Sequence, residues 1–117
     1  MKEYLTRLNE CVGIRGSLVI TRDGVIVASS MGDDLEQEAI GALASSVLNA
    51  LIGPGASPWV GEVSRFTLTA RHGRLIFEIM KSLVLVVATD KDIDLDITQL
   101  EISGMAKRFQ RMVRISV

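Results

Sequence analysis

Residues of the types that perform catalysis are scarce in this chain of 117 residues. His72 is the only histidine, and it precedes Gly73 in a predicted hairpin turn, where an imidazole is normally solvated. Cys11 is the only cysteine, with no histidine or basic cluster near it in sequence, so we expect it to pack as a small apolar residue. Because no nucleophile, base and orienting group can be assembled from these residues, we predict no catalytic residues and a protein that is not an enzyme.

An acidic segment, residues 90–101, resembles a calcium-binding loop in its spacing of carboxylates. The acids stand at the first, third, fifth and twelfth positions, as Asp90, Asp92, Asp94 and Glu101. The sixth position is Leu95, however, where such a loop needs glycine for its sharp turn, and a strand instead of a helix is predicted before it. We therefore predict no metal site and interpret the segment as the acidic start of a helix.

The sequence also gives no support for a phosphate-binding loop. Its charge and composition argue against binding to nucleic acid and insertion into a membrane. The Gly-Pro-Gly sequence at 53–55 follows a predicted helix and lacks the Gly-Lys-Ser/Thr ending of a phosphate-binding loop, so no cofactor is expected. The net charge of −1 gives no general attraction to nucleic acid. The longest apolar run, 83–88, is too short for membrane insertion. With a single cysteine and a length that suits one domain over residues 1–117, we expect a cytoplasmic protein.

Three helices and five strands are predicted from the periodicity of the apolar residues and from the turn signals. The helices are expected at 2–12, 34–52 and 97–114, and the strands at 17–22, 25–28, 62–70, 75–80 and 83–88. Asp23-Gly24 predicts a tight hairpin in which both turn residues have positive φ. The strand at 83–88 is apolar without alternation, which places it at the centre of the sheet with both faces covered. The order α-β-β-α-β-β-β-α predicts an α+β fold: a five-stranded antiparallel sheet with helices on both faces.

The second helix is expected to begin at Asp34, with Gln37 three residues later as in a capping box, and to end before Gly53. Its large apolar face would consist of Ile40, Leu43, Ala44, Val47, Leu48 and Leu51. The opposite side carries only small, uncharged residues: Gly41, Ala42, Ser45, Ser46 and Asn49. No charged residue or histidine occurs between positions 39 and 61.

An ordinary surface helix places charged residues on its exposed side, whereas charge depletion is typical of the centre of protein interfaces. We therefore predict that the small-residue side of the second helix binds another protein chain. Trp59 follows this helix and could be either a core residue or an interface anchor. The strand at 62–70, with Arg65 and Thr67 on its exposed side, would leave an open edge at the rim of the sheet. Pairing of that edge between two copies would form one continuous sheet across a symmetric dimer.

With these features, the chain resembles the Roadblock family, which includes Roadblock-type dynein light chains and bacterial regulators of Ras-like GTPases. The resemblance covers nearly the whole chain. It rests on the order of the elements, on the hairpin at 18–29 with its Asp-Gly turn and Ala-Ser ending, and on the small-residue helix at 35–51. The resemblance implies a dimer with a continuous sheet and adjacent second helices, and a platform for a small Ras-like GTPase encoded elsewhere.

Two classes of function follow from the resemblance and from the uncharged helix. The first is a non-enzymatic dimeric regulator or scaffold that binds a small Ras-like GTPase. The second is a structural dimerisation module of a motor or signalling assembly with no GTPase partner. The dimer could form with a second copy or with a paralogous Roadblock protein, and no residue motif indicates whether a partner would be activated, inhibited or localised.

Overall fold

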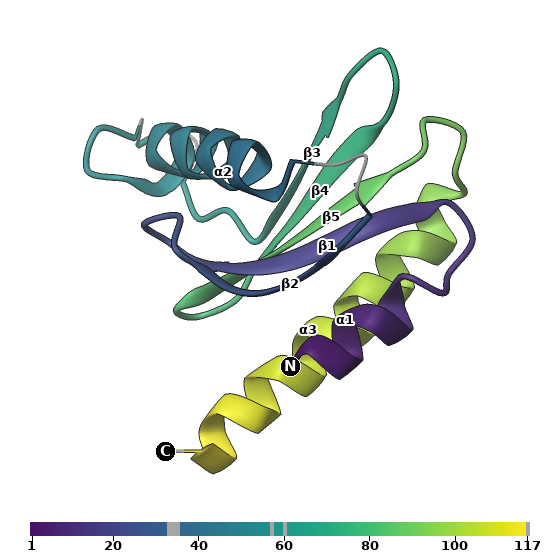
Figure 1. Cartoon of the computed structure of the whole chain (residues 1–117). Coiled ribbons are helices and arrows are strands. Elements are labelled where there is room, and N and C mark those ends of the chain that lie inside the picture. The colour runs from purple at the N-terminus through teal and green to yellow at the C-terminus, as the bar shows by residue number, and fades with distance from the viewer. Residues whose placement is uncertain (33–35, 57, 60, 117) are drawn as a thin grey trace.

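The structure is a computed structural model that describes residues 1–32, 36–56, 58–59 and 61–116. Its elements follow the predicted order (Figure 1). They are α1 (Lys2–Leu8), β1 (Ile14–Thr21), β2 (Ile26–Met31), α2 (Gln37–Ile52), β3 (Arg65–Thr69), β4 (Arg74–Ile79), β5 (Leu83–Thr89) and α3 (Leu95–Ser116). None of the described helices combines the length and the apolar character needed to cross a membrane.

The five strands form one antiparallel sheet in the order β2-β1-β5-β4-β3. The predicted central position of β5 is confirmed, since it pairs with β1 on one side and β4 on the other. Both faces of β5 are buried because its side chains alternate between two apolar clusters. Leu85 and Val87 belong to one cluster, and Val84 and Val86 belong to the other.

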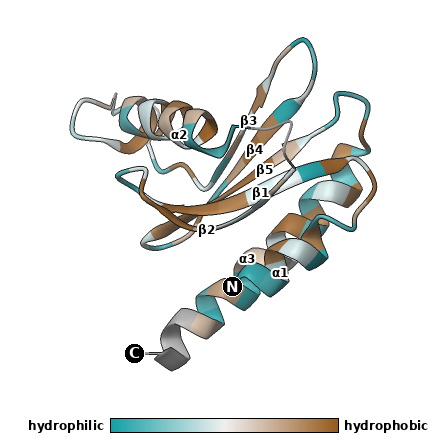
Figure 2. Cartoon of the chain, in the orientation of Figure 1, coloured by the Kyte–Doolittle hydropathy of each residue, from teal (hydrophilic) through white to brown (hydrophobic). Residues whose placement is uncertain are grey.

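Helices cover both faces of this sheet, as predicted: α1 and α3 lie side by side on one face and α2 lies on the other (Figure 1). Leu5 of α1 and Phe109 of α3 are fully buried in the first cluster, and the ring of Tyr4 meets the Phe109 ring edge-on at 5.8 Å between centroids. Ala44 and Leu48 of α2 are buried in the second cluster. Figure 2 shows the resulting layers, with mostly hydrophobic strands between the helices.

The β1–β2 hairpin has a longer turn than the sequence predicts. Within this turn only Gly24 has a positive φ, of 93°, so the expectation that Asp23 would share this conformation is wrong. The amide of Gly24 donates to the carbonyl of Thr21, and the amide of Thr21 donates to the carbonyl of Val25. Three residues, 22–24, therefore form the loop, in which a single glycine in the left-handed region is sufficient.

The predicted end of the first helix needs correction. This helix ends at Leu8 and does not continue to Val12, which is 95% exposed. It ends there because the Asn9 side chain leaves the helix to bind the strands: its Nδ2 donates to the Ser30 carbonyl at 2.7 Å, and its Oδ1 accepts from the Ser17 hydroxyl at 2.8 Å. Cys11 consequently lies in the following loop and is partly buried.

The starts of the other two helices also differ from the predicted ones. The second helix begins at Gln37, and its N-cap, Glu36, makes no side-chain capping bond. The predicted start at Asp34 lies outside the described residues. The third helix begins earlier than predicted, at Leu95, and Asp94 caps it. The Asp94 carboxylate accepts hydrogen bonds from the amides of Asp96 and Ile97, at 3.1 and 3.2 Å.

Candidate protein interface

The outward side of α2 is exposed and, after Glu38 in its first turn, uncharged. Six exposed residues follow one another along this side at helical spacing: Ala39, Ala42, Leu43, Ser46, Asn49 and Ala50. We call these six residues the α2 outer face. Leu43 was predicted to lie on the buried side of the helix but is 47% exposed. The α2 outer face therefore includes one large apolar side chain beside its smaller residues. The sequence reasoning also missed Ala39 and Ala50, although both share the helical repeat of Ser46.

Two residues of the predicted interface set instead face the hairpin of their own chain. Gly41 is buried, and a Cβ at this position would lie 3.6 Å from the Ile26 side chain. The Ser45 hydroxyl donates a hydrogen bond of 3.2 Å to the Asp23 carbonyl. These two small residues allow the hairpin to approach α2 closely, and Ala42, Ser46 and Asn49 remain exposed.

Trp59 is 92% exposed, so it is not a core residue of this chain. It lies in the connection between α2 and β3, after the residues that end the helix. An indole of this size in contact with solvent is unusual, because aromatic side chains contribute large apolar areas when they are buried. The connection between α2 and the edge strand β3 therefore carries an exposed aromatic side chain.

The strand β3 is the last strand of the sheet on its side and pairs only with β4 among the described strands. Its side chains alternate between the two faces. Phe66 points to the α2 side and stacks on Phe77 of β4, with ring centroids 4.3 Å apart. Thr67 is half-buried and lies opposite Ile76 of the other apolar cluster, which places it on the α3 side.

Arg65 also points to the α3 side, where it is held within its own chain. Its Nε and Nη2 atoms donate to the two carboxylate oxygens of Glu78, its cross-strand neighbour, and Nη2 also donates to the Ser103 hydroxyl of α3. The hydrogen bond with Glu78 raises the pKa of Arg65 above its ordinary value. Arg65 therefore joins β3, β4 and α3, and its guanidinium is only partly accessible to another chain.

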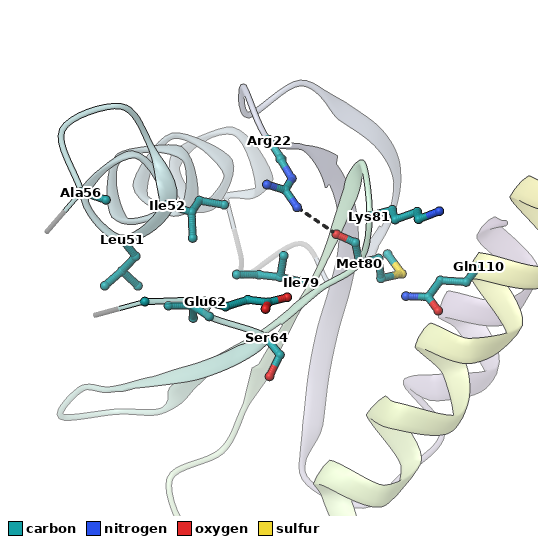
Figure 3. Close-up of a pocket in the computed structure, with 12 residues that line it drawn as sticks. Arg22, Leu51, Ile52, Ala56, Glu62, Ser64, Ile79, Met80, Lys81 and Gln110 are labelled. Carbon is teal, nitrogen blue, oxygen red and sulfur yellow. Dashed lines mark hydrogen bonds between the residues drawn. The ribbon is translucent and has the colours of Figure 1, made fainter. Parts of the chain in front are cut away.

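A groove of about 500 Å³ lies between the C-terminal end of α2 and the β4–β5 connection (Figure 3). Leu51 and Ile52 form part of one wall, and Arg22 reaches across to donate a hydrogen bond of 3.4 Å to the Met80 carbonyl. The described residues that line the groove include neither histidine nor cysteine. The described lining of the groove mixes apolar side chains, such as Leu51 and Ile79, with the charged Glu62 and Lys81.

The residues considered for catalysis and metal binding are dispersed. His72 is exposed in the turn between β3 and β4. Burial raises the pKa of the Cys11 thiol, and the negative charges of Glu101 and Glu10 raise it further. In the acidic segment, Asp94 serves as a helix cap. Within the described part of the chain, no three histidine, cysteine or acidic side chains are placed to hold a metal ion.

Comparison with known protein families gives one match that covers most of the chain. A family model described as the Roadblock/LC7 domain matches residues 1–89, which include every element from α1 to β5. Two uncharacterized proteins of Methanocaldococcus jannaschii, MJ1340 and MJ0310, are each 28% identical over 108 residues. The matched region is 92% of this chain and 95% of each relative.

Solved structures share the fold at lower identity. MglB of Myxococcus xanthus superposes with a TM-score of 0.85 at 17% identity, covering 99% of this chain and 89% of that chain. A Roadblock/LC7 domain from Streptomyces avermitilis gives a TM-score of 0.79 at 14% identity, covering 97% and 98%. Profilin IB of Acanthamoeba castellanii gives 0.64 at 15% identity, covering 92% and 94%.

Proposed function

The chain belongs to the Roadblock/LC7 domain family, and we propose that it is a cytoplasmic, non-catalytic dimer that binds a small Ras-like GTPase. The observation that carries this proposal is the α2 outer face, an exposed helical surface on which all six side chains are uncharged. Four of the six are Ala39, Ala42, Ser46 and Ala50, whose small side chains allow close approach of another backbone. A surface with this composition is suited to contact with protein and offers no chemistry of its own.

The dimer is proposed to form with a second copy or a paralogous chain through β3 and α2. The unpaired edge of β3 can add the same strand of a second chain, giving one continuous sheet across a two-fold axis. Because α2 and Phe66 of β3 lie on the same side of the sheet, this pairing brings the two α2 helices near each other. The Arg65 contacts with Glu78 and Ser103 fix β3 to the rest of the fold, so the edge is presented in a defined position.

The paired α2 helices are the proposed docking surface for the GTPase. The γ-phosphate orders the switch segments of such GTPases, and these segments loosen after hydrolysis. A platform that touches them must bind the two nucleotide states differently, by about 1–3 kcal/mol if the coupling is of ordinary size. The family resemblance implies the class of partner, and the uncharged helical face is the feature of this chain that supports it.

The test is to measure binding of Ras-like GTPases from the same genome, each loaded with GDP or with a non-hydrolysable GTP analogue. A Kd about 5- to 150-fold lower for one nucleotide state is expected. Ala42→Glu, on the α2 outer face, should weaken binding, whereas Glu3→Gln, exposed on α1, should not. Equal affinities for both states would leave a passive scaffold. Failure of every GTPase to bind would favour a structural dimerisation module.

A further inference from the structure

A second exposed helical surface lies on α3, on the face of the sheet opposite α2 (Figure 1). Its outermost residues alternate in steps of three and four: Ile97, Leu100, Gly104, Lys107 and Arg111. Ile97 and Leu100 are 60% and 73% exposed, although both are large and apolar. Nothing lies within 4 Å of the place where a Cβ of Gly104 would stand, so the backbone is open at the middle of this stripe.

Charge divides the stripe into two halves on either side of Gly104. The half toward the start of the helix carries the exposed acids Asp96 and Glu101 beside the two apolar residues. The half toward the end carries exposed Lys107, Arg108 and Arg111, of which Arg108 and Arg111 line a surface hollow with Tyr4 and Arg7. None of these three basic groups forms an ion pair with another described residue.

We propose that this stripe binds the same stripe of a second copy, with the two α3 helices antiparallel and crossing at Gly104. Residues at similar distances from Gly104 and on the same flank of the stripe then lie opposite each other. Glu101 of each chain meets Arg108 of the other on one flank of the stripe, and Leu100 meets the aliphatic stem of Lys107 on the other flank. Ile97 meets Arg111, whose aliphatic stem can cover an apolar side chain while its guanidinium stays solvated.

A second copy of the chain would contact both halves of the stripe, whereas other occupants would contact only one half. An acidic peptide or an anionic membrane would satisfy Lys107, Arg108 and Arg111 but would leave Ile97, Leu100 and Glu101 uncovered. A two-fold axis at Gly104 places the half of each stripe that carries Glu101 against the basic half of the other stripe. Every contact then occurs twice, which is the property of an isologous interface. The absence of a side chain at the crossing point lets the two helices approach closely, and complementary charges fix their antiparallel register.

This contact lies apart from the proposed α2 and β3 dimer, and neither depends on the other. The two surfaces are on opposite faces of the sheet, so a chain that uses both would link dimers into assemblies of four or more chains. A chain that uses only the α3 stripe would still form dimers. The α3 contact relies on solvated ion pairs and is therefore expected to be the weaker one and to be sensitive to salt.

The α3 contact can be tested by charge exchange in a background that removes the other interface. In Ser46→Arg protein, sedimentation at ~50 mM salt should detect self-association that is lost at ~500 mM salt, where screening is strong. Glu101→Lys alone and Arg108→Glu alone should each raise the dissociation constant about tenfold. The double variant Glu101→Lys/Arg108→Glu should restore it. Absence of recovery in the double variant would overturn the proposed register.

A cross-linking experiment detects the same contact even if it is weak. In a Cys11→Ser background, Gly104→Cys should form a disulfide-linked dimer under mild oxidation, because the two-fold axis brings the two positions together. Gln110→Cys, exposed on the same helix but off the stripe, is the matched control. Equal cross-linking of the two variants, or no cross-linking of the Gly104→Cys variant, would exclude the interface. Unfolding midpoints in urea verify that all variants fold.

Discussion

Arg65 and Glu78 face each other across β3 and β4 as partners in the strand register, and Arg65 also reaches Ser103 of α3. One guanidinium therefore joins the outermost strand of the sheet to its neighbour and to the helix behind it. The side chains of Arg65 and Glu78 are 30% and 15% exposed, so the pair is shielded from solvent more than ordinary surface ion pairs are.

Replacement of Arg65 by alanine is expected to lower the free energy of unfolding by about 1–2 kcal/mol, since hydrogen bonds to charged groups contribute more than neutral ones. Urea denaturation followed by circular dichroism measures the change. Arg71→Ala, which removes an exposed arginine without an ion pair to another described residue, serves as the control and should change stability little. Similar stabilities for the Arg65 variant and the native chain would show that the contacts to Glu78 and Ser103 contribute nothing measurable.

Substitution of Gly24 by alanine should destabilise the fold by about 1–3 kcal/mol. Gly24 has a φ of 93°, and an added Cβ would lie 2.7 Å from the Ser45 Cβ, so both the backbone and the contact with α2 would be strained. Gly55→Ala is the matched control, because nothing lies within 4 Å of its Cβ position. Thermal unfolding of the two variants should separate them clearly, and equal melting temperatures would contradict the packing of the hairpin on α2.

Ser46→Arg is expected to weaken the proposed α2 dimer while leaving the fold intact. Ser46 is exposed in the single chain, so the arginine meets solvent there, but at a close contact between two helices it would be buried without a partner. Sedimentation over a range of concentrations measures the change. Glu3→Arg, on α1 across the sheet, should have no such effect. Unchanged dimerisation of the Ser46 variant would mean that the α2 outer face is solvated.

Alkylation of Cys11 should be slow at neutral pH and should accelerate only as the pH rises above the ordinary range of a thiol. Burial, followed by the charges of Glu101 and Glu10, raises the pKa of this thiol, and a raised pKa lowers the fraction of reactive thiolate at any given pH. Glu101→Gln removes one of these charges and should shift the rate profile toward lower pH. A profile identical to that of a free cysteine in the unfolded chain would contradict this placement.

The order of the elements and the central position of β5 could be predicted because they depend on patterns that local sequence carries. The uninterrupted apolar run of β5 required cover on both faces, and the clusters around Leu85 and Val86 provide it. The Asp23-Gly24 signal located the hairpin correctly, although it could not reveal that the loop has three residues.

The errors arose where a long-range contact overrides a local pattern. Val12 continued the helical spacing of Leu5 and Leu8, but Asn9 ends the helix by binding Ser17 and Ser30. Arg65 was predicted to be on an exposed face, and its contact with Ser103 depends on how α3 crosses the sheet. The division of the small side of α2 into Gly41 and Ser45, which face the hairpin, and Ser46, which faces solvent, likewise depends on where the hairpin lies.

The central position of β5 also has a consequence for the order in which the molecule can assemble. Leu18 of β1 pairs with Val86 of β5, so the two halves of the sheet are joined by residues 68 positions apart, from 18 to 86. The β1–β2 hairpin can close soon after its synthesis, but it cannot join β4 and β3 until β5 has emerged. Pairing over such a distance in sequence slows folding, because the entropy of closing a long loop is lost before the contacts form. During synthesis on the ribosome, the β1 edge of the hairpin would therefore stay unpaired until β5 has emerged and pairs with it.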